Sequence, residues 1–325
     1  MRNLRLLFIL PFFITSCIEE YDLNFNNSEP RLVVEGLVTN KSGPYYVRLT
    51  KSNIGVHTTA DYSFTDNAEP VMNALVIISD DLGLADTLLP IDVILSEYNF
   101  NPLLGYFKLI NDDFGNVIDT LFLQDPPEYR HERGFYKTTK LVGISGHTYT
   151  LHVTAEGKTY DATAYMPPVP EIDSVGYIKK ISEKDGQEYY IPLLFFADPQ
   201  GISNFYLIQL ITEEASRSMS AKTLWQFSIL SDAFLEPYVK GLNIQLGISP
   251  NDIQYPLLWE GDSIYVALSS LSETAYDFYE VLLDQFKNDG GVYKQVPASP
   301  PTNISNGGLG LFRASAVVEG RIIIK

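Results

Sequence analysis

Short runs of alternating apolar and polar residues, rich in Val, Ile, Tyr and Thr, recur along the first half of the chain between turn residues. A period of two is typical of strands that bury one face. The runs predict strands at 32–39, 45–52, 74–79, 106–110, 117–123 and 148–155. The last run and 158–164 flank Glu156-Gly157, which predicts a hairpin with a two-residue turn. Many short strands at this spacing favour a β-sandwich.

The residues before Tyr149 carry a more specific signal. Leu141 and Gly146 precede Tyr149 in a pattern that resembles the tyrosine corner of immunoglobulin and fibronectin-type sandwiches, where the phenol bonds back to the backbone. An ordinary strand tyrosine is the alternative. We expect an Ig-like β-sandwich domain at 31–166.

Three prolines then interrupt the strand pattern. Pro167, Pro168 and Pro170 deny backbone donors to a sheet and stiffen the chain. We therefore expect a semi-rigid Pro-rich linker at 167–171, followed by a second β-rich domain at 172–325.

The second half contains further strand-like runs and one helical pattern. The predicted strands lie at 175–181, 189–197, 205–212, 224–230 and 263–268. Apolar residues at three- and four-residue spacings predict a helix at 271–287, capped by Ser272, with one face on a sheet. That face comprises Leu271, Ala275, Phe278, Leu282 and Phe286. The final runs, 311–318 and 321–324, are separated by Glu319-Gly320 and predict a terminal hairpin.

The N-terminal residues resemble a lipoprotein signal. Arg2 and Arg5 precede an apolar stretch at 4–14 that is too short to span a membrane. It ends in Ile14-Thr15-Ser16-Cys17, which looks like a bacterial lipobox, and Cys17 is the single cysteine of the chain. We expect the signal peptide 1–16 to be cleaved between Ser16 and Cys17. Cys17 then carries a diacylglyceryl group and an N-acyl chain such as palmitate, which together anchor the protein durably. An ordinary signal peptide with a thiol at Cys17 is the alternative.

A polar segment without periodicity follows the cysteine. Residues 17–30 predict a flexible, lipidated tether. Glu19, Glu20 and Asp22 resemble the signal that sends Bacteroidota lipoproteins to the cell surface, with a simply solvated tether as the alternative. We therefore expect an outer-membrane protein that is lipid-anchored and faces outward.

Composition narrows the classes of partner. The 325 residues are 45% hydrophobic, enough for two cores and too many for a disordered chain. A formal net charge of −17, with no basic stripe, argues against a nucleic-acid partner.

No catalytic motif occurs, and we expect no enzymatic activity, no cofactor and no metal. The four histidines, which have no metal-ligand spacing, are His57, His131, His147 and His152. The acid-rich segments 80–83 and 111–116 lack the spacing of an EF-hand, so turns are favoured over calcium loops. The polar-flanked tyrosines that are candidates for surface contacts are Tyr129, Tyr136, Tyr238 and Tyr293.

Four Asp-Ser/Thr-apolar tripeptides resemble the O-glycosylation acceptor of exported Bacteroidota proteins. Their acceptor hydroxyls belong to Thr87, Thr120, Ser174 and Ser263. Modification at these positions is a hypothesis that glycan mass on the residues would support.

Three segments together resemble one family. They are Leu-Val-Val-Glu-Gly-Leu-Val-Thr-Asn at 32–40, Gly-Pro-Tyr-Tyr-Val-Arg-Leu at 43–49 and Asn-Ile-Ser-Asn-Gly-Gly-Leu-Gly-Leu-Phe at 303–312. With Ala197-Asp198-Pro199 and 204–206, they are similar to Bacteroidota lipoproteins grouped as domain of unknown function 4249. The resemblance implies an accessory of TonB-dependent outer-membrane receptors and carries over no catalytic residue.

The irregular stretch at 297–310 is expected to be a shaped loop. It and the residues just after it form the candidate partner or ligand loop, comprising Asn303, Asn306, Gly307, Gly308, Gly310 and Phe312.

The leading hypothesis is a surface lipoprotein that binds a nutrient or docks on a TonB-dependent receptor; its cargo is unknown. The alternatives are a surface hydrolase of glycan or peptide, which needs converging carboxylates in a cleft, and a structural or adhesive surface protein, which needs a flat aromatic face.

Overall fold

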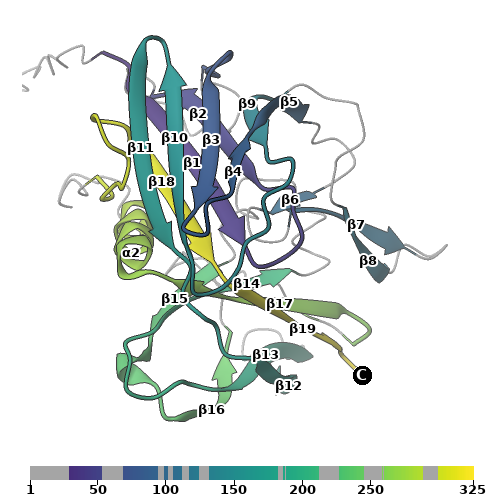
Figure 1. Cartoon of the computed structure of the whole chain (residues 1–325). Coiled ribbons are helices and arrows are strands. Elements are labelled where there is room, and N and C mark those ends of the chain that lie inside the picture. The colour runs from purple at the N-terminus through teal and green to yellow at the C-terminus, as the bar shows by residue number, and fades with distance from the viewer. Residues whose placement is uncertain are drawn as a thin grey trace, which may run out of the picture.

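The computed structural model describes residues 29–52, 69–93, 99–101, 105–111, 117–123, 132–181, 186, 188–211, 227–244, 258, 260–287 and 299–325. Within these residues the chain is mainly β, with one α-helix, and forms two lobes (Figure 1). None of the described helices is long and apolar enough to cross a membrane.

The first lobe is a sandwich of two sheets. One sheet has the strand order β18-β1-β2-β9-β5, with bounds Leu309–Ser315, Leu32–Thr39, Tyr46–Lys51, Glu132–Lys137 and Leu89–Val93. The facing sheet has the order β11-β10-β3-β4, with bounds Lys158–Tyr165, Thr148–Ala155, Leu75–Asp80 and Ala85–Thr87. Alternation along β10 and β11 buries every second side chain between the sheets. The expected mainly β, sandwich-like architecture is therefore confirmed.

The second lobe packs two more sheets and the helix. Its three-stranded sheet is β12-β13-β16, with bounds Ile172–Ile181, Glu188–Ala197 and Tyr238–Asn243. Its four-stranded sheet is β15-β14-β17-β19, with bounds Phe227–Ser231, Phe205–Ile211, Ser263–Leu271 and Val317–Ile323. A 3-10 turn, η2, covers Asp232–Phe234, and helix α2 covers Glu273–Lys287. A separate small sheet joins β6, β7 and β8 at Asn99–Asn101, Gly105–Asn111 and Val117–Leu123.

The end of the chain returns to the first lobe, which differs from the expected domain division. β18 runs parallel to β1 in continuous register from Val33↔Leu309 to Thr39↔Ser315. Figure 1 shows this yellow strand beside the purple β1. Residues 303–316 thus complete the sandwich expected at 31–166 instead of belonging wholly to a domain at 172–325. Periodicity located the strand but carried no information about its distant partner.

The predicted terminal hairpin is wrong for the same reason. β18 pairs with β1, whereas β19 pairs antiparallel with β17 in the other lobe. Glu319 and Gly320 lie inside β19 instead of forming a turn. A side chain at Gly320 would meet Val175 Cγ2 at 2.6 Å, so this glycine admits the close packing of β12.

The Pro-rich segment is fixed between the lobes. Met166 is buried in the first core, and Val169 packs against the cores of both lobes. The Ser270 hydroxyl donates to the Pro167 carbonyl at 2.6 Å. Further contacts join Lys41 Nζ to Glu319 Oε2 at 3.2 Å and the Val317 N–H to Asn40 Oδ1 at 2.7 Å. The segment at 167–171 therefore contacts both lobes, and the contacts of Lys41 and Asn40 join the lobes beside it.

Helix α2 largely follows its prediction. Its first turn is capped as expected, because the Ala275 N–H donates to the Ser272 hydroxyl at 3.3 Å. Ala275 and Phe278 pack against the neighbouring sheet as predicted, and Leu283 packs there in place of Leu282. Leu271, predicted as the first helical residue, is instead the last residue of β17, so the helix begins at Glu273. The side chain of Phe286 lies outside the described residues.

Candidate functional site

The loop predicted to contact a partner closes the sandwich. The Asn303 amide donates to the Phe312 carbonyl at 2.6 Å and to the Thr163 carbonyl at 3.1 Å, while its Oδ1 accepts from the Phe312 N–H at 3.0 Å. Asn306 donates to the Thr159 carbonyl at 3.2 Å. Arg31, at the start of the fold, donates to the Gly307 carbonyl at 2.6 Å. The loop therefore ties β11, β18 and Arg31, which directly precedes β1, together.

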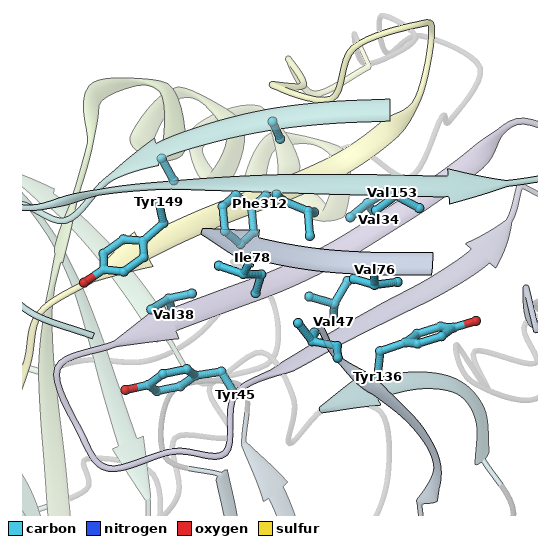
Figure 2. Close-up of a cluster of buried hydrophobic side chains, with 14 of the residues drawn as sticks. Val34, Val38, Tyr45, Val47, Val76, Ile78, Tyr136, Tyr149, Val153 and Phe312 are labelled. Atoms are coloured by element: carbon cyan, nitrogen blue, oxygen red, sulfur yellow. The ribbon is translucent and has the colours of Figure 1, made fainter. Parts of the chain in front are cut away.

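Two glycines of this loop are required by space. Gly310 has φ +88°, and a side chain there would lie 2.1 Å from the Val34 carbonyl oxygen. At Gly308 an added carbon would lie 2.4 Å from Ile304. Phe312 follows and is fully buried in the core that Figure 2 shows, beside Val34 and Ile78. Ser305, Asn306 and Gly307 form the exposed tip, so a partner contact at this loop stays a prediction for the tip alone.

The predicted tyrosine corner is present. Tyr149 is fully buried, and its hydroxyl donates to the Ile144 carbonyl at 3.2 Å and accepts from the Ile144 N–H at 2.6 Å. Burial raises the pKa of its phenol, and the bond from the Ile144 backbone opposes that shift. The ring thus fixes the loop that precedes β10.

Two other buried tyrosines do the same for neighbouring loops. The Tyr45 hydroxyl donates to the Lys41 carbonyl at 2.6 Å and accepts from the Gly143 N–H at 2.8 Å. Tyr136, proposed from the sequence as a surface residue, is only 1% exposed, and its hydroxyl donates to the Val71 carbonyl at 2.9 Å. That prediction is wrong, because β9 places the ring inside the sandwich (Figure 2). Tyr238, in contrast, is exposed.

A buried carboxylate on β4, that of Asp86, binds the backbone of the turn at 139–141. Asp86 is fully buried and accepts hydrogen bonds from the backbone N–H groups of Thr139, Lys140 and Leu141 and from the Thr139 hydroxyl, at 2.7–2.8 Å. Burial is the largest single influence on the pKa of this carboxyl and acts to raise it. The four hydrogen bonds together outweigh burial, so the net effect is a lowered pKa. Asp86 therefore stays charged and fixes the turn at 139–141.

The possible glycosylation positions differ in accessibility. Thr87, next to Asp86, and Ser174 are exposed. Ser263 is 4% exposed on β17, so its hydroxyl is not accessible in the folded chain. The side chain of Thr120 lies outside the described residues.

The Asp-Pro element of the second lobe is a structural corner. Asp198 is 6% exposed and accepts from the Tyr206 hydroxyl at 2.6 Å. Burial raises the pKa of the Asp198 carboxyl, and the hydrogen bond from Tyr206 opposes this shift. The pKa of the Tyr206 phenol is raised mainly by burial and secondly by its bond to Asp198. The Asn204 amide donates to the Pro199 carbonyl at 3.0 Å, and the Asn204 N–H donates to Asp232 at 2.7 Å. These bonds join the β13–β14 loop to η2.

Two histidines lie at β10, each beside one aspartate: His147 directly precedes the strand and His152 lies within it. His147 Nδ1 lies 2.8 Å from Asp81 Oδ1, and His152 Nδ1 lies 2.7 Å from Asp161 Oδ1. Among the described residues no group of three or more His, Cys, Asp or Glu side chains could hold a metal ion. His57 and His131 lie outside the described residues.

The most unusual charged group lies between the lobes. Arg313 of β18 is 5% exposed, and its Nη1 donates to the Ser315 hydroxyl at 3.3 Å. Its Cζ lies 5.2 Å from the ring centroid of Tyr279 on α2, a cation–π contact. Burial lowers the pKa of the guanidinium, and Tyr279 raises it. Such a group remains protonated at neutral pH.

The residues predicted for export and anchoring are outside the described part of the chain. They are Ser16, Cys17, Glu19, Glu20 and Asp22. The sequence could have located Asp86 and Arg313 in strand-like runs, but it gave no signal that either side chain is buried.

Comparison with known proteins yields one family. A family model described as "Domain of unknown function (DUF4249)" matches residues 18–321. No curated protein and no solved structure matches the chain. The match covers both lobes and begins one residue after Cys17.

Proposed function

Because the chain belongs to the family of domain of unknown function DUF4249, whose name assigns no activity, we propose a role from the anchor and the fold. The protein is a lipoprotein of the bacterial outer membrane, held by acyl groups on Cys17 and facing outward. It acts as a binding partner of a TonB-dependent receptor in nutrient capture.

The position of Arg31 is the observation that supports this proposal best. Arg31 directly precedes β1 and is bonded to Gly307 and Gly308 at one end of the sandwich. β1 then runs from Leu32 to Thr39 toward the second lobe (Figure 1). At about 3.3 Å per residue, this strand alone separates the tether from the second lobe by roughly 23 Å.

The tether sets the distance from the membrane. Residues 17–30 reach at most about 45 Å when fully extended. The sandwich is therefore held near the lipid surface and the second lobe extends beyond it. Confinement to this thin layer raises the effective concentration of the protein near a membrane receptor, so that modest direct affinity suffices for association.

Purification from native outer membranes tests the proposal. A tagged protein extracted in mild detergent is expected to bring down a TonB-dependent receptor in near-stoichiometric amount, identified by mass spectrometry. Cys17→Ala is the matched control, because it keeps the folded residues unchanged and removes the lipid attachment site. It should leave the membrane fraction and lose the receptor. Recovery of the anchored protein without any receptor would overturn the partner assignment.

Orientation is tested separately by protease added to intact cells. Digestion of the anchored protein without cell lysis is expected for an outward-facing chain. Protection until lysis would place the chain on the periplasmic side.

A further inference from the structure

A layer of buried side chains joins the two lobes. Leu37 and Leu311 enter it from the sandwich, and Leu207, Leu271 and Ala275 enter it from the second lobe. The layer is mostly apolar, so any polar group within it needs a hydrogen-bonding partner.

Three polar residues lie on the same strand faces as members of this layer. Gln209 is two residues from Leu207 on β14, Ser269 is two from Leu271 on β17, and Arg313 is two from Leu311 on β18. Residues two apart on a strand point to the same side. The three polar side chains therefore point into one layer from three strands.

Register and ring contacts relate the positions of these groups along the layer. Ser269 lies directly opposite Leu207, and Gln209 lies directly opposite Phe227. The Tyr279 ring centroid lies 5.4 Å from that of Phe227 and 5.2 Å from Arg313 Cζ. The Tyr279 ring therefore lies between the Arg313 guanidinium and the Phe227 ring, and Phe227 is the residue opposite Gln209.

These polar groups have few partners. The Ser269 hydroxyl and the Gln209 Oε1 are buried without a hydrogen bond. Among the described residues, Arg313 contacts the Ser315 hydroxyl and the Tyr279 ring, and no carboxylate of that part of the chain forms an ion pair with it. A buried cation is ordinarily paired with an anion, because an unpaired charge in an apolar layer is strongly unfavourable.

We propose that the layer between the lobes binds a small carboxylate. Arg313 recognises the carboxylate by charge-assisted hydrogen bonds, while Ser269 and Gln209 bind neighbouring polar atoms of the ligand. Tyr279 and Phe227 supply its aromatic walls. Gln209 and Tyr279 are partly exposed, so this end of the layer reaches the surface. The site is independent of the lipid anchor and of any receptor.

Thermal unfolding of the purified protein tests the site. Sodium acetate and sodium succinate are the probes, with sodium chloride keeping ionic strength constant. Each tenfold rise in carboxylate above its Kd is expected to raise the Tm by roughly 2 °C. Arg313→Met removes the charge and keeps the volume, so it should abolish the response. Its ligand-free Tm should equal or exceed that of the parent, because the unpaired buried charge is gone.

Arg31→Gln is the matched control, since Arg31 bonds the closing loop outside this layer and its loss should leave the carboxylate response unchanged. If Arg313→Met does not fold, Gln209→Leu serves in its place and should weaken the response to succinate, which has a second polar group, at least several-fold in Kd. The proposal is overturned if neither carboxylate shifts the parent Tm, or if the variant that folds responds as the parent does.

Discussion

Single hydroxyl groups fix the loops of the sandwich, and Tyr149 offers the clearest test. Removing its hydroxyl in Tyr149→Phe leaves the backbone of Ile144 without its partner. We expect a loss of about 1–2 kcal/mol in the free energy of unfolding, measured by urea denaturation. The control is Tyr165→Phe, because Tyr165 is 46% exposed on the neighbouring strand and should change stability by less than about 0.5 kcal/mol. Equal losses in the two variants would contradict the corner's role.

Asp86 predicts a pH dependence at the same scale. Its pKa is lowered in the folded state, so its contribution is present above the unfolded pKa of about 3.9 and is lost as pH falls through the folded value. Asp86→Asn should lose about 2–4 kcal/mol at pH 7, and its difference from the parent should shrink in acid. Unfolding curves from pH 7 to pH 2 measure this.

Asp198 supplies the opposite sign as a comparison. Burial raises its folded pKa, so its charged form is disfavoured and the parent gains stability relative to Asp198→Asn as pH falls. The stability difference between parent and variant should therefore change in opposite directions with pH for Asp86→Asn and Asp198→Asn. A change in the same direction for both variants would refute the assignment for Asp86.

Residue patterns in the sequence predict some of these roles and miss others. The tyrosine corner follows from Leu141, Gly146 and Tyr149 because its bond is local, between residues five apart. Asp86 was interpreted as part of a glycosylation tripeptide, because its bonds reach residues 139–141, more than fifty positions away. Local sequence carries no information about such contacts, and the same limit applies to Arg313.

At the scale of elements, the approach of β18 to β1 depends on glycine. Gly310 and Gly307 both have positive φ, at +88° and +74°, but only Gly310 has backbone within reach of a side chain. Gly307→Ala should therefore lose about 1 kcal/mol from backbone strain alone. Gly310→Ala adds a collision with the Val34 carbonyl and should lose about 3 kcal/mol or more. Chemical denaturation of both variants gives the comparison, and similar losses would refute the steric argument.

A comparison of the observed strands with the sequence shows which strands hydrophobic periodicity predicts and which it misses. Strands such as 32–39, 117–123 and 148–155 match their predicted bounds because alternation or β-branched content marks them. β9 and β16 were missed, since Glu132–Lys137 and Tyr238–Asn243 contain glycine and charged residues that interrupt the pattern. These strands are specified by pairing with neighbours, which is a tertiary effect.

At the scale of the whole molecule, the chain order makes the first lobe depend on the last residues. β18 covers one edge of the sandwich and places Phe312 and Ala314 in its core, together with Ala316 directly after the strand. A fragment of residues 29–170 retains every other strand of this sandwich but lacks these side chains and seven paired positions of β1. Replacing a buried Phe alone costs about 3–5 kcal/mol, against a total stability of about 5–15 kcal/mol.

We therefore expect the 29–170 fragment to lack a cooperative unfolding transition by circular dichroism, although it corresponds closely to the domain predicted from the sequence. A peptide of residues 299–318 should restore the transition by supplying β18 in trans. The same peptide with Phe312→Ala should bind at least tenfold more weakly, because it keeps the ladder and loses the core ring. Cooperative folding of the fragment without peptide would mean that β18 only covers a finished sandwich. Rescue that depends on Phe312 would mean that the two lobes form one folding unit, because the chain that builds the second lobe also completes the first.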